Sequence, residues 1–162
     1  MAIDMFLKVG GIDGESIDAA HVGEIDVLAY SLGFSNSGDV RAGTGGGAGA
    51  GKASANDLAV SVYFSKASLP LFSAVVTGKI FANATLTLRK GGANPFEFLK
   101  IRLENVLVNS DSMGGSGGED RLTENYTLNY ARIIFTYTGQ DPTGAALPPI
   151  RAGFDFSTNT KI

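Results

Sequence analysis

The 162-residue sequence contains no cysteine, which excludes both a disulfide framework and a zinc–thiolate site. This absence fits a protein that folds in a reducing cytoplasm. A chain of this length forms one ordinary domain and buries about two thirds of its unfolded surface, so it needs no covalent or metal staple.

Long apolar runs and an excess of basic residues are also missing. No stretch approaches the about 20 apolar residues that span a bilayer, and the first residues show no basic segment followed by an apolar one. We therefore expect no membrane insertion and no signal peptide. The net charge of -3, with scattered Lys and Arg, predicts no binding to nucleic acid.

Residues that carry acid–base or nucleophilic chemistry are scarce. His21 is the single histidine, and its place in a glycine-rich turn predicts a surface residue. Glu119, Asp120 and Glu124 form a carboxylate cluster that could hold calcium or act as an acid–base pair, but Arg121 among them favours ion pairing and turn capping. We predict no enzyme activity, no metal and no cofactor.

A glycine-rich run at 46–52 imitates a phosphate-binding loop. Such a loop requires a Ser or Thr after its lysine and then a helix, whereas Ala53 follows here and a strand is predicted next. The run 114–118 joins two predicted strands and opens no helix, so it also predicts no nucleotide site. It is either a flexible hairpin connection or a loop that adapts to a neighbouring subunit.

Alternation of apolar and polar residues predicts a mainly β fold with seven or eight strands. Predicted strands cover 3–9, 22–34, 58–65, 84–89, 96–108, 122–137 and 150–156. In the longest, apolar residues change face after Tyr130, which predicts one extra residue there, a β-bulge. A second bulge or bend is expected near Val106. Such a long, bent strand is typical of a barrel or a two-sheet sandwich.

One segment has a helical pattern. Ser68 is predicted to cap it, Pro70 suits its first turn, and Gly78 is a plausible end. The glycines gather in loops, and residues 35–56 are a Gly, Ala and Ser stretch that cannot pack a core. We therefore expect a flexible extended loop at about 37–56.

The run Gly-Gly-Ser-Gly-Gly-Glu-Asp-Arg-Leu-Thr-Glu-Asn at 114–125, followed by residues 127–131, closely resembles the haemolysin-coregulated protein (Hcp) family. This family supplies the tube protein of bacterial type VI secretion systems. Residues 1–8 and 24–29 match it in the same order. The resemblance spans nearly the whole chain and weakens after Gly139, which predicts a single tube domain over 1–162 with a variable tail at 139–162.

The resemblance implies a single compact β-barrel of two antiparallel sheets with one short flanking α-helix. It implies hexameric rings of this chain that stack into a hollow tube. In the family this tube lies inside contractile sheath proteins, carries a valine-glycine repeat spike protein at its tip, and delivers effectors from its lumen. Assembly in the bacterial cytoplasm and secretion by the type VI system itself are implied as well.

A hypothesis from another class is a monomeric β-barrel that binds a small ligand inside. Such a barrel needs a cavity, whereas this chain has enough Leu, Ile, Val and Phe to fill one. Long strands with two apolar faces favour self-assembly.

The tube hypothesis selects three sets of candidate residues. The ring-stacking loop comprises Val40, Arg41, Gly45, Gly46, Gly47 and Lys52; its apolar and basic side chains would contact acidic turns such as 119–120 of a neighbouring ring. The subunit-interface motif comprises Gly117, Gly118, Glu119, Asp120, Arg121 and Glu124. Ser31, whose strand face otherwise offers Gly33 and Ser35, is the candidate for a position facing the lumen and its cargo. The alternative for the loop is a disordered segment without a partner.

Overall fold

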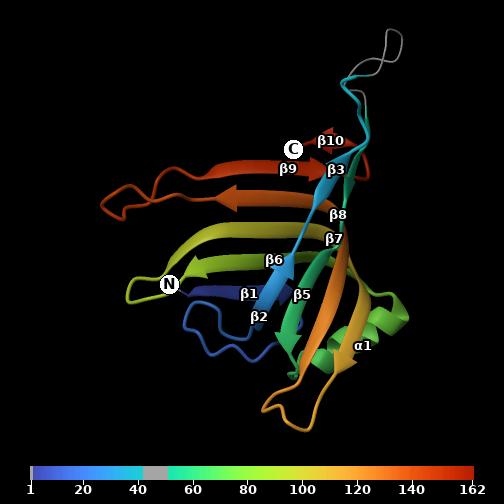
Figure 1. Cartoon of the computed structure of the whole chain (residues 1–162), viewed down its shortest axis with the longest axis vertical. Helices are drawn as coiled ribbons and strands as arrows, with labels where there is room; N and C mark the ends of the chain where they lie inside the picture. Colours follow the sequence, from blue (N-terminus) through green and yellow to red (C-terminus); the bar gives the residue numbers. More distant parts are fainter. Residues whose placement is uncertain (1, 42–50) are drawn as a thin grey trace.

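The computed structural model describes residues 2–41 and 51–162, and its chain folds into a mainly β structure (Figure 1). The elements are β1 (Ile3–Val9), β2 (Ile25–Ser31), β3 (Phe34–Asn36), β4 (Ala53–Ala55), β5 (Leu58–Tyr63), α1 (Ser68–Thr77), β6 (Ile80–Lys90), β7 (Phe96–Gly114), β8 (Thr123–Tyr137), β9 (Ile150–Asp155) and β10 (Thr160–Lys161). None of the helical structure described is long and apolar enough to cross a membrane.

Six strands close into a barrel. They pair in the order β8–β5–β2–β1–β6–β7, and β7 pairs back with β8 to complete the circle. Strands β9 and β10 extend the sheet from β8 beyond the closure, and β3 and β4 form a second, small sheet. The predicted mainly β barrel with one short helix is confirmed.

The barrel interior is filled by apolar side chains from all six barrel strands. Fully or nearly fully buried residues include Val9, Val27, Leu58, Val60, Leu86, Ile101, Leu103, Val106, Val108, Leu128 and Ile133. Helix α1 packs against β7 and adds Leu71 and Ala74 to this core. The packed interior disfavours the hypothesis of a ligand bound inside the barrel.

Three neighbouring strands change their buried face at the same level. Buried positions pass from Phe81 to Ala84 in β6, from Leu103 to Val106 in β7, and from Tyr130 to Ile133 in β8. The predicted change of face is therefore confirmed. The extra residue predicted after Tyr130 is wrong, because the β7–β8 register is the same on both sides of the change.

The bend predicted near Val106 exists, and Asn105, with a φ of 52°, lies at this level. The register shift between β7 and β8 falls further along, between Val108 and Ser110. The three paired strands thus bend together, so the sheet changes its inward face without losing its pairing.

The predicted strand over 22–34 is too long at both ends. Val22 is exposed in the loop before β2, and β2 ends at Ser31. Gly33 accepts a hydrogen bond from the Asn56 amide, and a Cβ at Gly33 would lie 2.8 Å from the Asn56 Nδ2. This close crossing takes the chain out of the barrel, so Phe34 begins the separate β3.

Helix α1 ends as predicted, because Gly78 adopts a φ of 68° and its N–H bonds the last turn. The predicted cap is wrong. Ala67 occupies the cap position without a side-chain hydrogen bond, and Ser68 is buried in the first turn. The Ser68 hydroxyl accepts from the Ser65 amide at 2.9 Å, before the helix, and donates to the Glu124 carboxylate.

Candidate assembly site

Strands β3 and β4 form a two-stranded ribbon that projects from one end of the barrel (Figure 1). Beyond the ribbon, the Ser37 amide donates to the Lys52 carbonyl at 3.3 Å and the Lys52 amide donates to the Ser37 hydroxyl at 3.0 Å. The flexible extended loop predicted at about 37–56, which we call the arm, therefore begins and ends at a paired base. Strand β4 lies within this predicted loop.

The candidate stacking residues lie along this arm. Val40, Arg41 and Lys52 are exposed, as contact with another molecule requires. The Arg41 Nε lies 3.8 Å from the Asp39 carboxylate. Gly45, Gly46 and Gly47 lie outside the described residues.

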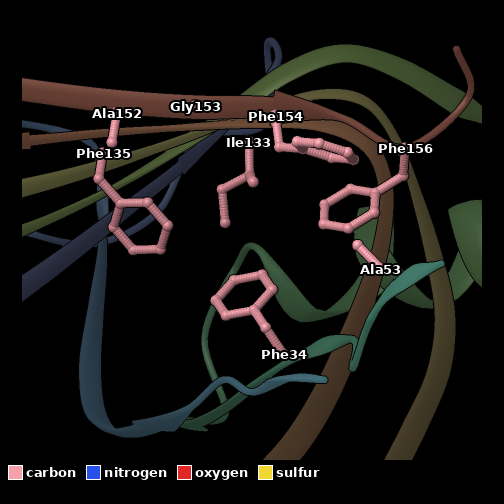
Figure 2. A pocket seen from close by; sticks show the side chains of 8 residues that line it. All are labelled: Phe34, Ala53, Ile133, Phe135, Ala152, Gly153, Phe154 and Phe156. Atoms are coloured by element: carbon pink, nitrogen blue, oxygen red, sulfur yellow. The ribbon is translucent and has the colours of Figure 1, made fainter. Parts of the chain in front are cut away.

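An apolar pocket of about 280 Å³ lies where the ribbon meets the barrel (Figure 2). Its lining consists of Phe34, Ala53, Ile133, Phe135, Ala152, Gly153, Phe154 and Phe156. The Phe34 ring lies edge-on to Phe135 at 5.9 Å and parallel to Phe156 at 6.3 Å between centroids. These aromatic contacts hold the base of the ribbon against β8 and the C-terminal segment.

The glycine-rich turn between β7 and β8 lies at the end of the molecule opposite the ribbon (Figure 1). The Glu119 amide donates to the Ser116 carbonyl at 3.1 Å, and Glu119 and Asp120 are exposed. The ion pairing expected here is wrong for the described residues, because neither acid pairs with Arg121. The Arg121 guanidinium instead covers the Tyr63 ring at 3.8 Å.

Glu124 is separate from this turn and is completely buried. Its Oε1 accepts the Ser68 hydroxyl hydrogen bond, while its Oε2, the Tyr126 hydroxyl and the Asp111 Oδ1 have no hydrogen-bond partner in the described part of the chain. Burial, assisted by Glu124, raises the pKa of Asp111 to about 6. Burial also raises the pKa of Tyr126. Glu124 thus joins α1 to β8 and cannot directly touch a second molecule.

His21 is buried, so the predicted surface position is wrong. Its ring stacks on Phe6 at 4.3 Å with planes 10° apart. The Nδ1 lies 2.7 Å from a Glu24 oxygen and the Nε2 lies 2.6 Å from a Glu97 oxygen. Glu97 is 76 residues away in the sequence, so local pattern gave no sign of this contact.

Arg89 forms a second polar cluster beside His21. Its guanidinium donates to both Asp18 oxygens at 2.9 and 2.6 Å and to Asp4 at 3.0 Å. The hydrogen bond from Arg89 lowers the pKa of Asp18 to about 2. Arg89 also lies over the Phe6 ring at 4.9 Å. Sequence reasoning missed this cluster because its members come from separate segments.

Ser31 lies on a face of small and polar side chains that crosses four strands. Strand pairing aligns Ser31, Ala59, Thr127 and Ser110 in one row, and Ala29, Ser61, Asn125 and Ser112 in the next. We call these eight residues the polar face. Each is exposed or partly exposed, whereas the alternate positions Val60 and Leu128 are buried. The sequence placed Ser31 on an open face but gave no strand order to reveal its neighbours.

Comparison with known proteins covers the whole chain. Residues 6–137 match the family described as "Type VI secretion system effector, Hcp". Protein hcp1 of Pseudomonas aeruginosa is 48% identical over 99% of both chains. The crystal structure of Hcp1 from Salmonella typhimurium is 35% identical, covers 100% of both chains and has a TM-score of 0.80. A structure described as a type six secretion system protein is 32% identical, covers 99% of this chain and 100% of its own, and has a TM-score of 0.92.

Proposed function

Because the chain belongs to the Hcp family of the type VI secretion system, we propose that it is a structural tube subunit that forms hexameric rings stacked into a hollow, secreted tube. The ring size rests on the family resemblance. Its role is structural and not enzymatic. The observation that carries the proposal is the polar face across β2, β5, β8 and β7.

The polar face has the chemistry that a transport channel needs. A lumen that passes varied cargo must stay wet and must not bind any one cargo tightly, so small and polar side chains suit it. Adjacent side chains here satisfy one another: the Ser61 hydroxyl donates to Asn125 at 2.5 Å, and Thr127 contacts both Ser110 and Asn109 by hydrogen bonds. We propose that this face lines the lumen and that Ser31 contacts cargo.

The arm has the position that ring stacking needs. It leaves one end of the molecule, and the acidic turn at 119–120 lies at the other (Figure 1). The ribbon at the base of the arm thus lies at the end of the subunit away from that subunit's own turn, so a contact between arm and turn is proposed to join two copies. We propose that Val40, Arg41 and Lys52 of one ring contact this turn, with its Gly117, Gly118 and Arg121, in the next ring. Each exposed ion pair contributes under about 1 kcal/mol, and repetition around a ring multiplies the effect.

The further partners follow from the tube role. We propose that contractile sheath proteins surround the tube, that a valine-glycine repeat spike protein tips it, and that effectors occupy its lumen. Assembly takes place in the bacterial cytoplasm, and the type VI system then exports the tube.

Negative-stain electron microscopy of the purified full-length protein tests the proposal. We expect rings with a central channel and, at higher concentration, stacks of rings. A field of single barrels at every concentration would instead favour the monomeric ligand-binding barrel.

A further inference from the structure

The loop at 10–24, between β1 and β2, is fastened to the barrel at two points. Asp18 is held by Arg89 of β6, and His21 is held between Glu24 of the loop and Glu97 of β7. Within the loop, the Gly14 amide donates to the Gly23 carbonyl at 2.7 Å. The two fastenings set the position of an otherwise irregular segment.

The geometry at His21 requires a particular form of the ring. Both ring nitrogens lie within 2.7 Å of a carboxylate oxygen, and ionised carboxylates only accept hydrogen bonds. Neutral imidazole carries one N–H, so it can donate a hydrogen bond to only one of the two carboxylates. The doubly protonated ring serves both, and the Phe6 ring face beneath it favours a cation.

Charged groups lie in this loop and on each of the strands next to it. They are Asp18 and Glu24 in the loop, Asp4 in β1, Asp26 in β2, Arg89 in β6, and Glu97 and Lys100 in β7. Arg89 engages Asp4 and Asp18, and Lys100 lies 3.2 Å from Glu97. Burial opposes ionisation of Glu97, but its hydrogen bonds with His21 and Lys100 prevail and lower its pKa. Glu24 has His21 as its cationic partner among the described residues.

We propose that His21 is a proton-dependent latch for the loop at 10–24. With both nitrogens protonated, the ring ties Glu24 to Glu97 and the loop is closed. Loss of one ring proton leaves a nitrogen lone pair facing a carboxylate, so the weaker of the two contacts is released and the loop opens at this end.

The second fastening does not respond to the same proton. Arg89 remains charged, and the low pKa of Asp18 keeps its carboxylate ionised well into the acidic range. Opening is therefore a pivot about Asp18 and not a detachment.

The loop carries two of the protein's exposed apolar side chains, Ile17 at 95% and Val22 at 71% exposure, so the latch fixes where this apolar surface lies.

The single histidine makes the latch directly measurable on the full-length protein. Selective ¹⁵N-histidine labelling reports the two ring nitrogens without ambiguity. We follow both ring signals from pH 5.5 to pH 9, and we expect the loop to be protected only where both nitrogens are protonated. Over the same range, hydrogen-exchange protection of the Gly14, Ser16 and Gly23 amides should fall at least about tenfold, since a hydrogen bond between charged groups is lost.

The variant His21→Gln supplies the control, because its amide cannot gain a charge. It should give low protection in this loop at both pH values, while the β1 and β6 amides keep theirs. Lys161→Gln, which removes an exposed charge far along the chain from this loop, should leave the wild-type pH dependence unchanged. A neutral ring at a pH where the loop is protected, a loop protection that changes less than twofold, or the same pH dependence in His21→Gln would each overturn the latch. Should His21→Gln not fold, the wild-type ring signals and protection decide the question alone.

Discussion

Ser61 and Asn125 lie directly opposite each other on β5 and β8, and the Ser61 hydroxyl donates to the Asn125 side-chain oxygen at 2.5 Å. The pair lies in the polar face, with the Ser31 row beside it. Its atoms satisfy one another at the surface, so this part of the barrel wall remains polar. An open hollow of about 290 Å³ lies here, lined by Ala29, Tyr30, Ser31, Ala59, Val60, Ser61 and Asn125.

Enlarging a side chain on the polar face should impair transport and not folding. Ser31→Gln adds a longer amide at the end of β2, and we expect retention and export of cargo to fall several-fold while the ring forms normally. Co-purification of cargo and its secretion measure the effect. Ser73→Gln, on the exposed side of α1, is the matched control. Normal cargo handling by Ser31→Gln would remove Ser31 from the lumen.

Shortening the arm should separate ring formation from ring stacking. Ordering a glycine-rich segment costs about 1 to 2 kcal/mol per residue, so a lasting ordered arm needs contacts from another molecule. Replacement of residues 43–50 by a two-residue turn should leave rings intact, abolish stacks and stop secretion. Electron microscopy and a secretion assay measure these outcomes, and stacks of normal length would contradict the role of the arm.

A charge reversal on the arm tests which side chains anchor it. Arg41→Glu and Lys52→Glu should each shorten stacks, because each would repel the acidic turn at 119–120. Combining either change with Glu119→Lys and Asp120→Lys should restore stack length. The control combines the same arm change with Lys161→Glu, which should not restore stack length. If Glu119→Lys and Asp120→Lys do not restore stack length, or if only the control does, the arm contacts another surface.

The buried hydrogen bond between Ser68 and Glu124 should stabilise the fold. Ser68→Ala removes the donor that Glu124 Oε1 has in the structure, and a buried acceptor that loses its donor costs about 1 to 3 kcal/mol. Urea unfolding at one fixed protein concentration measures this loss. The exposed Ser73→Ala should change stability by under about 0.5 kcal/mol. Equal effects of the two substitutions would show that the bond contributes little.

Asp111 should make stability fall with rising pH. Its pKa is raised from 3.8 to about 6, so the folded state binds more protons than the unfolded state between these values. The favourable contribution is complete below about pH 4 and is lost as the pH rises through about 6. Asp111→Asn should therefore gain about 1 kcal/mol relative to wild type between pH 4 and pH 7.5, a figure discounted for its partial exposure. An unchanged difference between the two proteins across this range would contradict the shift.

Local pattern predicted the elements that depend on neighbouring residues. The alternation at 124–130 marked the buried face of β8, and Gly78 marked the end of α1, because periodicity and glycine conformation act over a few residues. The bend near Val106 was visible for the same reason. The cause of this bend could not be predicted, since three paired strands bend together and the register between them is a tertiary property.

Contacts between distant segments could not be predicted from pattern. His21 lies between acids that the sequence separates, and its glycine-rich surroundings indicated an exposed turn. Phe34 looked like the end of a strand, although its partners Phe135 and Phe156 lie a hundred residues or more along the chain. The polar face required the strand order before Ser31 could be placed beside Ala59 and Thr127.

The mass of the purified protein in solution tests the tube account most directly. Static light scattering at tens of micromolar should give a discrete particle of six times the 16.8 kDa chain mass, because a closed ring satisfies the surfaces that one subunit leaves open. A mass of 16.8 kDa across that concentration range would contradict the ring and, with it, the tube.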